Sequence, residues 1–63
     1  LLSRSDKREL QKLLNARGFN TGGTSGTIGP RTRSAISNYQ HRIGQTPDGY
    51  ADARLLERLR RGL

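Results

Sequence analysis

Few side chains in this 63-residue chain have the chemistry of a catalyst. It holds one histidine, His41, no cysteine, and five carboxylates. A metal site needs several ligands placed together, so His41 without a second ligand of its kind is a poor candidate. A glycosidase needs two carboxyl groups flanking a sugar cleft, and a chain of this size has little room for one. The sequence therefore predicts no catalytic residue, no metal site and no cofactor.

The carboxylates have structural roles that explain them. A Ser or Asp ahead of an apolar helical pattern caps a helix, and an acidic residue three positions later completes that cap. Acidic residues also stabilise turns and pair with arginines one helical turn away. We therefore assign all five to the fold: Asp6 and Glu9 to helix capping, Asp48 to a turn, Asp52 to a helix N-cap, and Glu57 to a pair with Arg61.

The charge of the chain is strongly positive. Twelve Lys and Arg stand against five Asp and Glu, which gives a formal net charge of +7. Such a surface attracts a polyanion, whether nucleic acid, anionic lipid or an acidic cell-wall polymer, and the charge alone does not choose among them. No stretch of the sequence approaches the apolar length that spans a bilayer.

The length of the chain limits it to one domain with a small core. Without cysteine there is no disulfide, so packing, helix caps and turns must hold the fold. The chain begins at Leu1 rather than Met, which suggests a piece of a longer protein. We expect residues 1–5 to be a linker from that parent chain and residues 6–63 to form the domain.

Three segments have the apolar spacing of amphipathic helices. The first covers about residues 6–17 and ends at Gly18. The second covers about residues 30–43 and begins at Pro30, which is favoured at the first helical position. The third begins at residue 51 or 52 and closes at Gly62. Their apolar stripes are Leu10, Leu13 and Leu14, then Ala35, Ile36, Tyr39 and Ile43, then Leu55, Leu56 and Leu59.

The two connections carry the signals of ordered loops. The Gly-rich segment 20–29 is predicted to fold around one buried residue, Ile28, and segment 46–49 to form a type I turn. The segment before the second helix also resembles the one before the third, since an apolar side chain follows Gly in each. The predicted fold is all-α: a compact three-helix bundle with a Gly-rich loop between its first and second helices.

Taken in order, the motifs resemble a known family. They are Leu10-Gln11-x-Leu13-Leu14 with Gly18-Phe19, then Gly26-x-x-Gly29-Pro30-x-Thr32-x-x-Ala35-Ile36-x-x-Tyr39-Gln40, then Gly44, Asp48-Gly49-Tyr50 and Leu55-Leu56-x-x-Leu59. This order and spacing, over about residues 6–60, resembles the peptidoglycan-binding domain type 1 family, and its last part resembles the C-terminal module of lytic murein transglycosylases. The family usually has Asp where this chain has Ser25, which puts any ligand contact by that carboxylate in doubt.

The resemblance implies a non-catalytic module that tethers a cell-wall-degrading enzyme to peptidoglycan. Its partner would be the glycan strand or the stem peptide, and its parent a lytic transglycosylase or another murein hydrolase. The resemblance further implies a monomer in the periplasm or cell wall of a bacterium, with no membrane span and no specific nucleic acid. It also suggests that Gln40, which matches the family's Gln, bonds loop backbone inside the fold.

The candidate ligand contacts lie off the apolar stripes. Phe19 and Tyr39 are expected to pack in the core. Tyr50 has two interpretations, an anchor for the third helix, which the repeated segment favours, and a ligand contact. Amides at the start of the second helix are a further candidate, with Arg31 and Arg33 adding charge for a stem-peptide carboxylate. The predicted ligand-binding residues are Asn20, Thr27, Arg31, Asn38, Arg42, Gln45 and Tyr50.

Two other functions stay open at this point. Three short basic helices are also typical of helix-turn-helix proteins, in which the third helix enters a DNA major groove. Against that interpretation, the first connection is long for the usual tight turn, and the third helix has almost no Asn, Gln or Ser to contact bases. A protein-interaction module of the cell envelope is the second alternative, since one fold can serve several partners.

Overall fold

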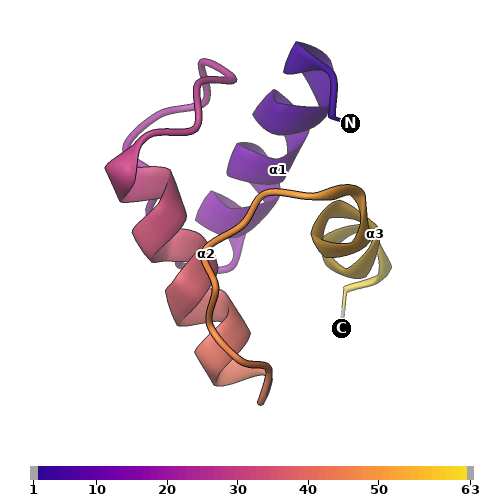
Figure 1. Ribbon diagram of the computed structural model, residues 1–63. Coiled ribbons are helices and arrows are strands. Elements are labelled where there is room, and N and C mark those ends of the chain that lie inside the picture. Colours follow the sequence, from indigo (N-terminus) through magenta and orange to yellow (C-terminus); the bar gives the residue numbers. More distant parts are fainter. Residues whose placement is uncertain (1, 63) are drawn as a thin grey trace.

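The computed structural model describes residues 2–62, in which three α-helices are joined by two irregular connections (Figure 1). α1 spans Arg4–Ala16, α2 spans Pro30–Arg42 and α3 spans Ala53–Arg61. No strand occurs among these residues, which confirms the predicted all-α class. α1 packs against both α2 and α3, and the molecule measures 27 × 20 × 20 Å.

The N-terminus of α1 lies two residues before the predicted start. The Ser3 hydroxyl accepts a hydrogen bond from the Asp6 N–H, and the Asp6 carboxylate accepts one from the Ser3 N–H, both at 3.1 Å. Asp6 therefore closes a capping box that begins at Ser3. The segment predicted as a linker, residues 1–5, thus contains the helix cap Ser3 and the first helical residues, Arg4 and Ser5. Leu1 lies outside the described residues. The division into linker and domain stays a prediction.

The other helix ends agree with the sequence. Pro30 is the first residue of α2, and the Asp52 side chain caps α3 by accepting from the Leu55 N–H at 2.8 Å. Gly62 ends α3 in the left-handed conformation, with φ of 77°, which a residue with a Cβ adopts only at a cost.

The core lies where the three apolar stripes meet. Leu13 and Ile43 are partly buried at its edge, and Phe19 stands edge-on to Tyr39 with ring centroids 5.6 Å apart. The predicted packing role of both aromatic rings is thereby confirmed. The buried apolar residues are Leu10, Leu14, Ala35, Ile36, Tyr39, Leu55, Leu56 and Leu59.

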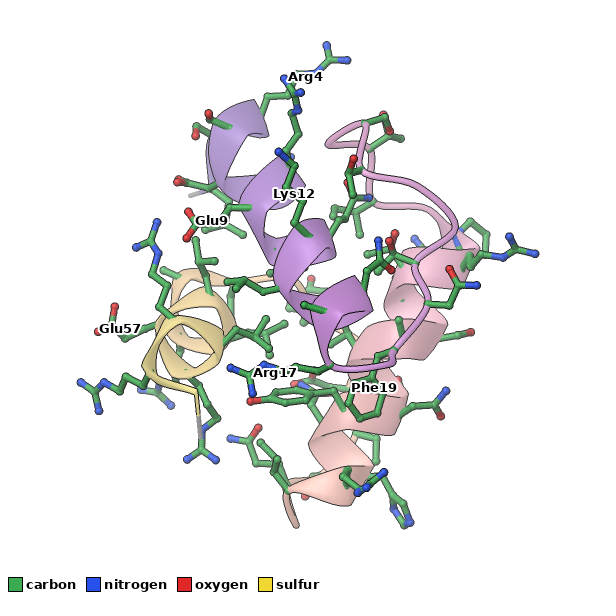
Figure 2. The ribbon with its side chains drawn as sticks, turned by 180° about the vertical axis from the view of Figure 1, so that it is seen from behind. Arg4, Glu9, Lys12, Arg17, Phe19 and Glu57 are labelled. Carbon is green, nitrogen blue, oxygen red and sulfur yellow. The ribbon has the colours of Figure 1, made fainter. Side chains whose placement is uncertain are left out.

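Polar contacts fix α3 along α1. Contrary to prediction, Glu9 does not cap a helix: its two carboxylate oxygens accept from the Arg60 guanidinium at 2.8 and 2.9 Å. This bidentate pair lowers the pKa of Glu9 from its ordinary value. At the other end of α1, Arg17 Nη2 donates to the Leu59 carbonyl at 2.6 Å. Figure 2 shows Glu9 and Arg17 beside α3, so these contacts set how the two helices lie together.

One buried glutamine holds the Gly-rich loop. Gln11 is 2% exposed, and its Oε1 accepts from the Gly26 N–H at 2.8 Å. Its Nε2 donates to the Thr27 carbonyl at 2.9 Å and to the Thr32 hydroxyl at 3.1 Å. The predicted anchor, Ile28, is only partly buried. The anchor is therefore a side-chain amide on α1, and the prediction of an apolar one is wrong.

In the described part of the chain, none of the helices is both long and apolar enough to cross a membrane.

We expect Gln11→Leu to lower the free energy of unfolding by about 1–3 kcal/mol, because the buried Gly26 N–H loses its acceptor. Urea unfolding followed by circular dichroism measures the change. The matched control is Gln45→Leu, which alters an exposed glutamine side chain and should shift the midpoint little. Equal midpoints for the two variants would show that Gln11 does not hold the loop.

Candidate functional site

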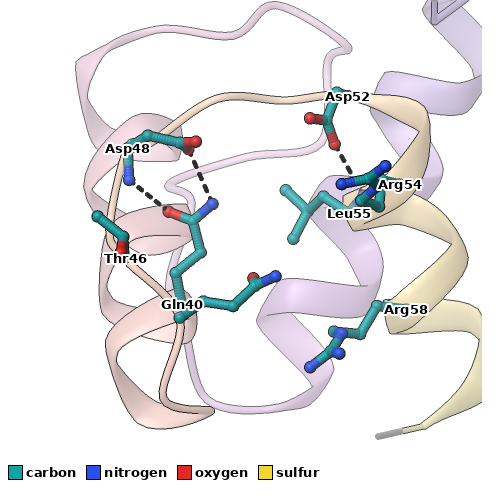
Figure 3. A pocket seen from close by; sticks show the side chains of 8 residues that line it. Gln40, Thr46, Asp48, Asp52, Arg54, Leu55 and Arg58 are labelled. Atoms are coloured by element: carbon teal, nitrogen blue, oxygen red, sulfur yellow. Dashed lines mark hydrogen bonds between the residues drawn. The ribbon is translucent and has the colours of Figure 1, made fainter.

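A polar hollow of about 310 Å³ lies between α2 and α3 (Figure 3). One wall is the end of α2 with the segment that follows it, and the other is the first two turns of α3. Apart from Leu55 its lining is polar or charged, with two carboxylates and two guanidinium groups. The lining residues are Gln40, Gln45, Thr46, Asp48, Asp52, Arg54, Leu55 and Arg58.

Gln40 positions the first wall. This side chain is 6% exposed, and its Oε1 accepts from the Asp48 and Gly49 N–H groups at 2.9 and 3.0 Å. Its Nε2 donates to Asp48 Oδ1 at 2.9 Å, a bond drawn in Figure 3. The expected role of Gln40, bonding loop backbone inside the fold, is confirmed.

The backbone around Asp48 differs from the predicted type I turn. Residues 45–50 are irregular, and the Gly49 N–H bonds to Gln40 Oε1 instead of the Thr46 carbonyl. Asp48 Oδ1 also accepts from the Tyr50 N–H at 2.9 Å. This bond, followed by the one from Gln40, lowers the pKa of Asp48 from its ordinary value of 3.8, so the carboxylate is ionised at neutral pH.

Tyr50 does not anchor α3. Its side chain is 72% exposed, which makes it the large apolar residue most open to solvent in the described chain. The next residue, Ala51, packs against the core in its place. The core interpretation of Tyr50 is therefore wrong, and a ligand contact stays a prediction.

The α3 wall of the hollow carries two arginines one helical turn apart. Arg54 is exposed and lies in the first turn, and Arg58 is partly buried (Figure 3). Neither makes a hydrogen bond or an ion pair within residues 2–62. By contrast, Arg60 pairs with Glu9, and Arg61 pairs with Glu57 at 3.5 Å. The predicted pair of Glu57 with Arg61 is thereby confirmed. The hollow thus presents two cations that no other described residue pairs.

A second hollow, of about 330 Å³, lies under the Gly-rich loop at the start of α2. Asn15 and Asn20 shape this loop by accepting backbone N–H groups of Thr21 and Gly22, each at 2.8 Å. No carboxylate lines it, and its one charged residue is Arg31. A third depression, of about 370 Å³, runs along α2 past Asn38.

The predicted ligand contacts do not form one site. Thr27 and Arg31 line the second hollow and Asn38 the third. Gln45 lines the hollow between α2 and α3, whereas Asn20, Arg42 and Tyr50 are exposed and line none of these hollows.

Sequence reasoning missed Arg54 and Arg58 and treated the arginines of the third helix as mostly a solvated face. A usable signal was present, because like charges spaced i,i+4 destabilise a helix. The same spacing occurs at Arg8 and Lys12 on α1, so it draws attention to the pair without assigning it a role. Within residues 2–62 no three His, Cys, Asp or Glu side chains are grouped to hold a metal ion.

This chain is similar to a known domain family and to a solved protein structure. The family described as "Putative peptidoglycan binding domain" matches residues 3–59. The fold is similar to SltB3 from Pseudomonas aeruginosa in complex with NAG-anhNAM-pentapeptide, with a TM-score of 0.91 and 48% identity over 95% of this chain. It is also similar to the complex of SltB3 with NAG-NAM-pentapeptide, with a TM-score of 0.90 and 47% identity over 94% of this chain. Each match covers 16% of the SltB3 chain, and no curated protein matches.

The Asp48 bonds predict an acid-sensitive fold. Because its pKa is lowered on folding, the ionised carboxylate stabilises the fold above its ordinary pKa of 3.8, and this contribution is lost as pH falls through the folded pKa. Asp48→Asn should therefore lose less stability than the original chain between about pH 7 and about pH 3. Thermal unfolding at both pH values measures this. If Asp48→Asn loses as much stability as the original chain over this pH range, the assignment to Asp48 is wrong. Glu9→Gln serves as the comparison, because the pKa of Glu9 is also lowered.

Proposed function

We propose that this chain, which belongs to the peptidoglycan-binding domain family, is a non-catalytic module that holds a cell-wall-degrading enzyme against its insoluble substrate. The observation that carries the proposal is the likeness to SltB3 at 48% identity over 95% of this chain and 16% of that one. A unit that recurs as a small part of a larger protein is suited to an accessory role. The parent enzyme would be a lytic transglycosylase or another murein hydrolase.

Tethering works through effective concentration. A module with weak affinity for a polymer keeps the linked catalytic domain near many copies of its substrate, so cleavage sites are met more often than by free diffusion. Weak binding also allows release and movement along the polymer. The parent protein would act in the bacterial envelope, in the periplasm or cell wall, where peptidoglycan lies.

The surface of the chain suits a hydrated polymer better than an apolar ligand. The hollow between α2 and α3 is lined mainly by amides, hydroxyls and charged groups. Such groups bond the hydroxyls of a glycan strand or the carboxylates of a stem peptide. The net charge of +7 adds an attraction to an anionic wall.

The test is co-sedimentation of the chain with insoluble peptidoglycan. We expect saturable binding that persists when salt rises from about 50 mM to about 200 mM, and no release of soluble fragments. The same chain is mixed with duplex DNA as the comparison, for which charge alone predicts a steep loss of binding over that salt range. A chain that stays in the supernatant with peptidoglycan, and binds DNA at the higher salt, would contradict the proposal.

A further inference from the structure

Arg54 is placed unfavourably on its own helix, whereas Arg58 lies in the last turn, where the helix dipole favours a cation. They lie at i,i+4 on α3, where like charges repel. Arg54 also lies in the first turn, at the positive end of the helix dipole, where an anion is favoured and a cation is not. Both effects are relieved by an anion bound beside the two guanidinium groups.

No carboxylate among residues 2–62 forms an ion pair with either guanidinium group, although Glu57 lines a neighbouring hollow with both. Arg17, Arg60 and Arg61 each have an acceptor from another part of the chain or from their own helix. Arg54 and Arg58 have none within residues 2–62, although Arg58 is partly withdrawn from water. Figure 3 shows both side chains leaving α3 at the hollow. A carboxylate is a suitable acceptor, since guanidinium groups bond it with two parallel hydrogen bonds.

The hollow also has acceptors for a cation. Asp48 and Asp52 each use Oδ1 for the fold, in bonds to backbone N–H groups of Tyr50 and Leu55. Their Oδ2 atoms accept no hydrogen bond among the described residues. An ammonium group would therefore meet free carboxylate oxygens on the same hollow that presents the two arginines.

This arrangement selects among peptidoglycan components. A glycan strand offers mainly hydroxyl groups, with a lactyl carboxylate where its peptide has been removed, but no ammonium group for the aspartates. A phosphate polymer would pair with the arginines but would bring no cation for the two aspartates. A stem peptide carries free carboxylates and, at a diamino acid, a free ammonium group. A hollow of about 310 Å³ has room for a short peptide segment.

We propose that the hollow between α2 and α3 binds the stem peptide of peptidoglycan, with Arg54 and Arg58 on a carboxylate and Asp48 and Asp52 toward an ammonium group. This inference rests on the proposed function and specifies its ligand. It makes α3 and the segment after α2 the recognition surface and leaves the Gly-rich loop outside it.

The first test titrates a soluble stem peptide into Arg54→Gln, Arg58→Gln and the double variant, followed by amide shifts. Each single variant should weaken binding about tenfold, because a charge-assisted hydrogen bond is lost. The matched control is the double variant Arg8→Gln and Lys12→Gln, which removes two exposed cations at the same i,i+4 spacing on α1. If the control variant binds the stem peptide as weakly as the Arg54 and Arg58 double variant does, the loss of affinity follows from net charge alone, and the proposal is overturned.

The second test changes the ligand. A peptide with its carboxylates amidated should bind the original chain about tenfold more weakly. For the double variant of Arg54 and Arg58, the amidated peptide and the unmodified peptide should bind with the same affinity. A peptide with its amine acetylated should also bind the original chain more weakly. A loss on amidation that is the same in both proteins would mean that the carboxylate binds elsewhere, which overturns the assignment.

A final comparison separates this inference from the proposed function. The chain is sedimented with intact peptidoglycan and with glycan strands stripped of their peptides by an amidase. Binding to the intact polymer alone supports both proposals. Equal binding to both polymers keeps the tethering role and overturns stem-peptide recognition. Binding to neither overturns the function itself, and binding only to duplex DNA would favour the nucleic-acid alternative.

Discussion

A buried carboxamide holds each of the two connections of this small protein. Gln11 on α1 bonds the Gly-rich loop, and Gln40 on α2 bonds the segment before α3. A glutamine suits this role because its side chain both accepts and donates, so one residue satisfies N–H groups and an oxygen of a loop together. The connections have few apolar residues to bury, so without these amides little would fix them. Because the two glutamines are buried, each missing bond would leave a polar group away from water.

The two connections repeat one local geometry. Gly26 and Gly49 both give their N–H to a glutamine Oε1, and both have positive φ, 92° and 71°. The residue before each glycine then accepts from the N–H two positions further on, Ser25 from Thr27 at 3.2 Å and Asp48 from Tyr50 at 2.9 Å. A Cβ on Gly26 would lie 3.1 Å from the Arg4 carbonyl and one on Gly49 3.3 Å from that of Arg33, so both approaches need glycine. The two connections are therefore alike mainly in how their backbone N–H groups are bonded, which explains why their sequences are only weakly similar.

Periodicity, together with the Gly and Pro signals at the helix ends, was enough to predict the three helices and most of the core, because burial of one stripe per helix leaves little choice of packing. The capping of α3 by Asp52 and the pair of Glu57 with Arg61 were also predictable, since both join residues within one helical turn. Glu9 was not, because its partner lies 51 residues away and any of several arginines could have served. The prediction that Tyr50 anchors α3 was wrong because the two connections were aligned one residue out of step. Ile28 lies two residues after Gly26, and the residue two positions after Gly49 is Ala51. The equivalent of Ile28 is thus Ala51, which packs against the core, while Tyr50 occupies the exposed place of Thr27.

The same repeat explains why the two hollows differ in chemistry. Where the second connection has Asp48, the first has Ser25, whose hydroxyl keeps the local hydrogen bond but carries no charge. The hollow under the Gly-rich loop is therefore left with Arg31 as its charged residue, whereas the hollow between α2 and α3 has charges of both signs. Ser25 thus keeps the local hydrogen bond that Asp48 makes in the second connection but leaves the first hollow without a carboxylate. Of these two hollows, the one at the second connection therefore offers complementary charge to a ligand with both an acid and an amine, and Arg54 and Arg58, which have no partner within residues 2–62, lie there.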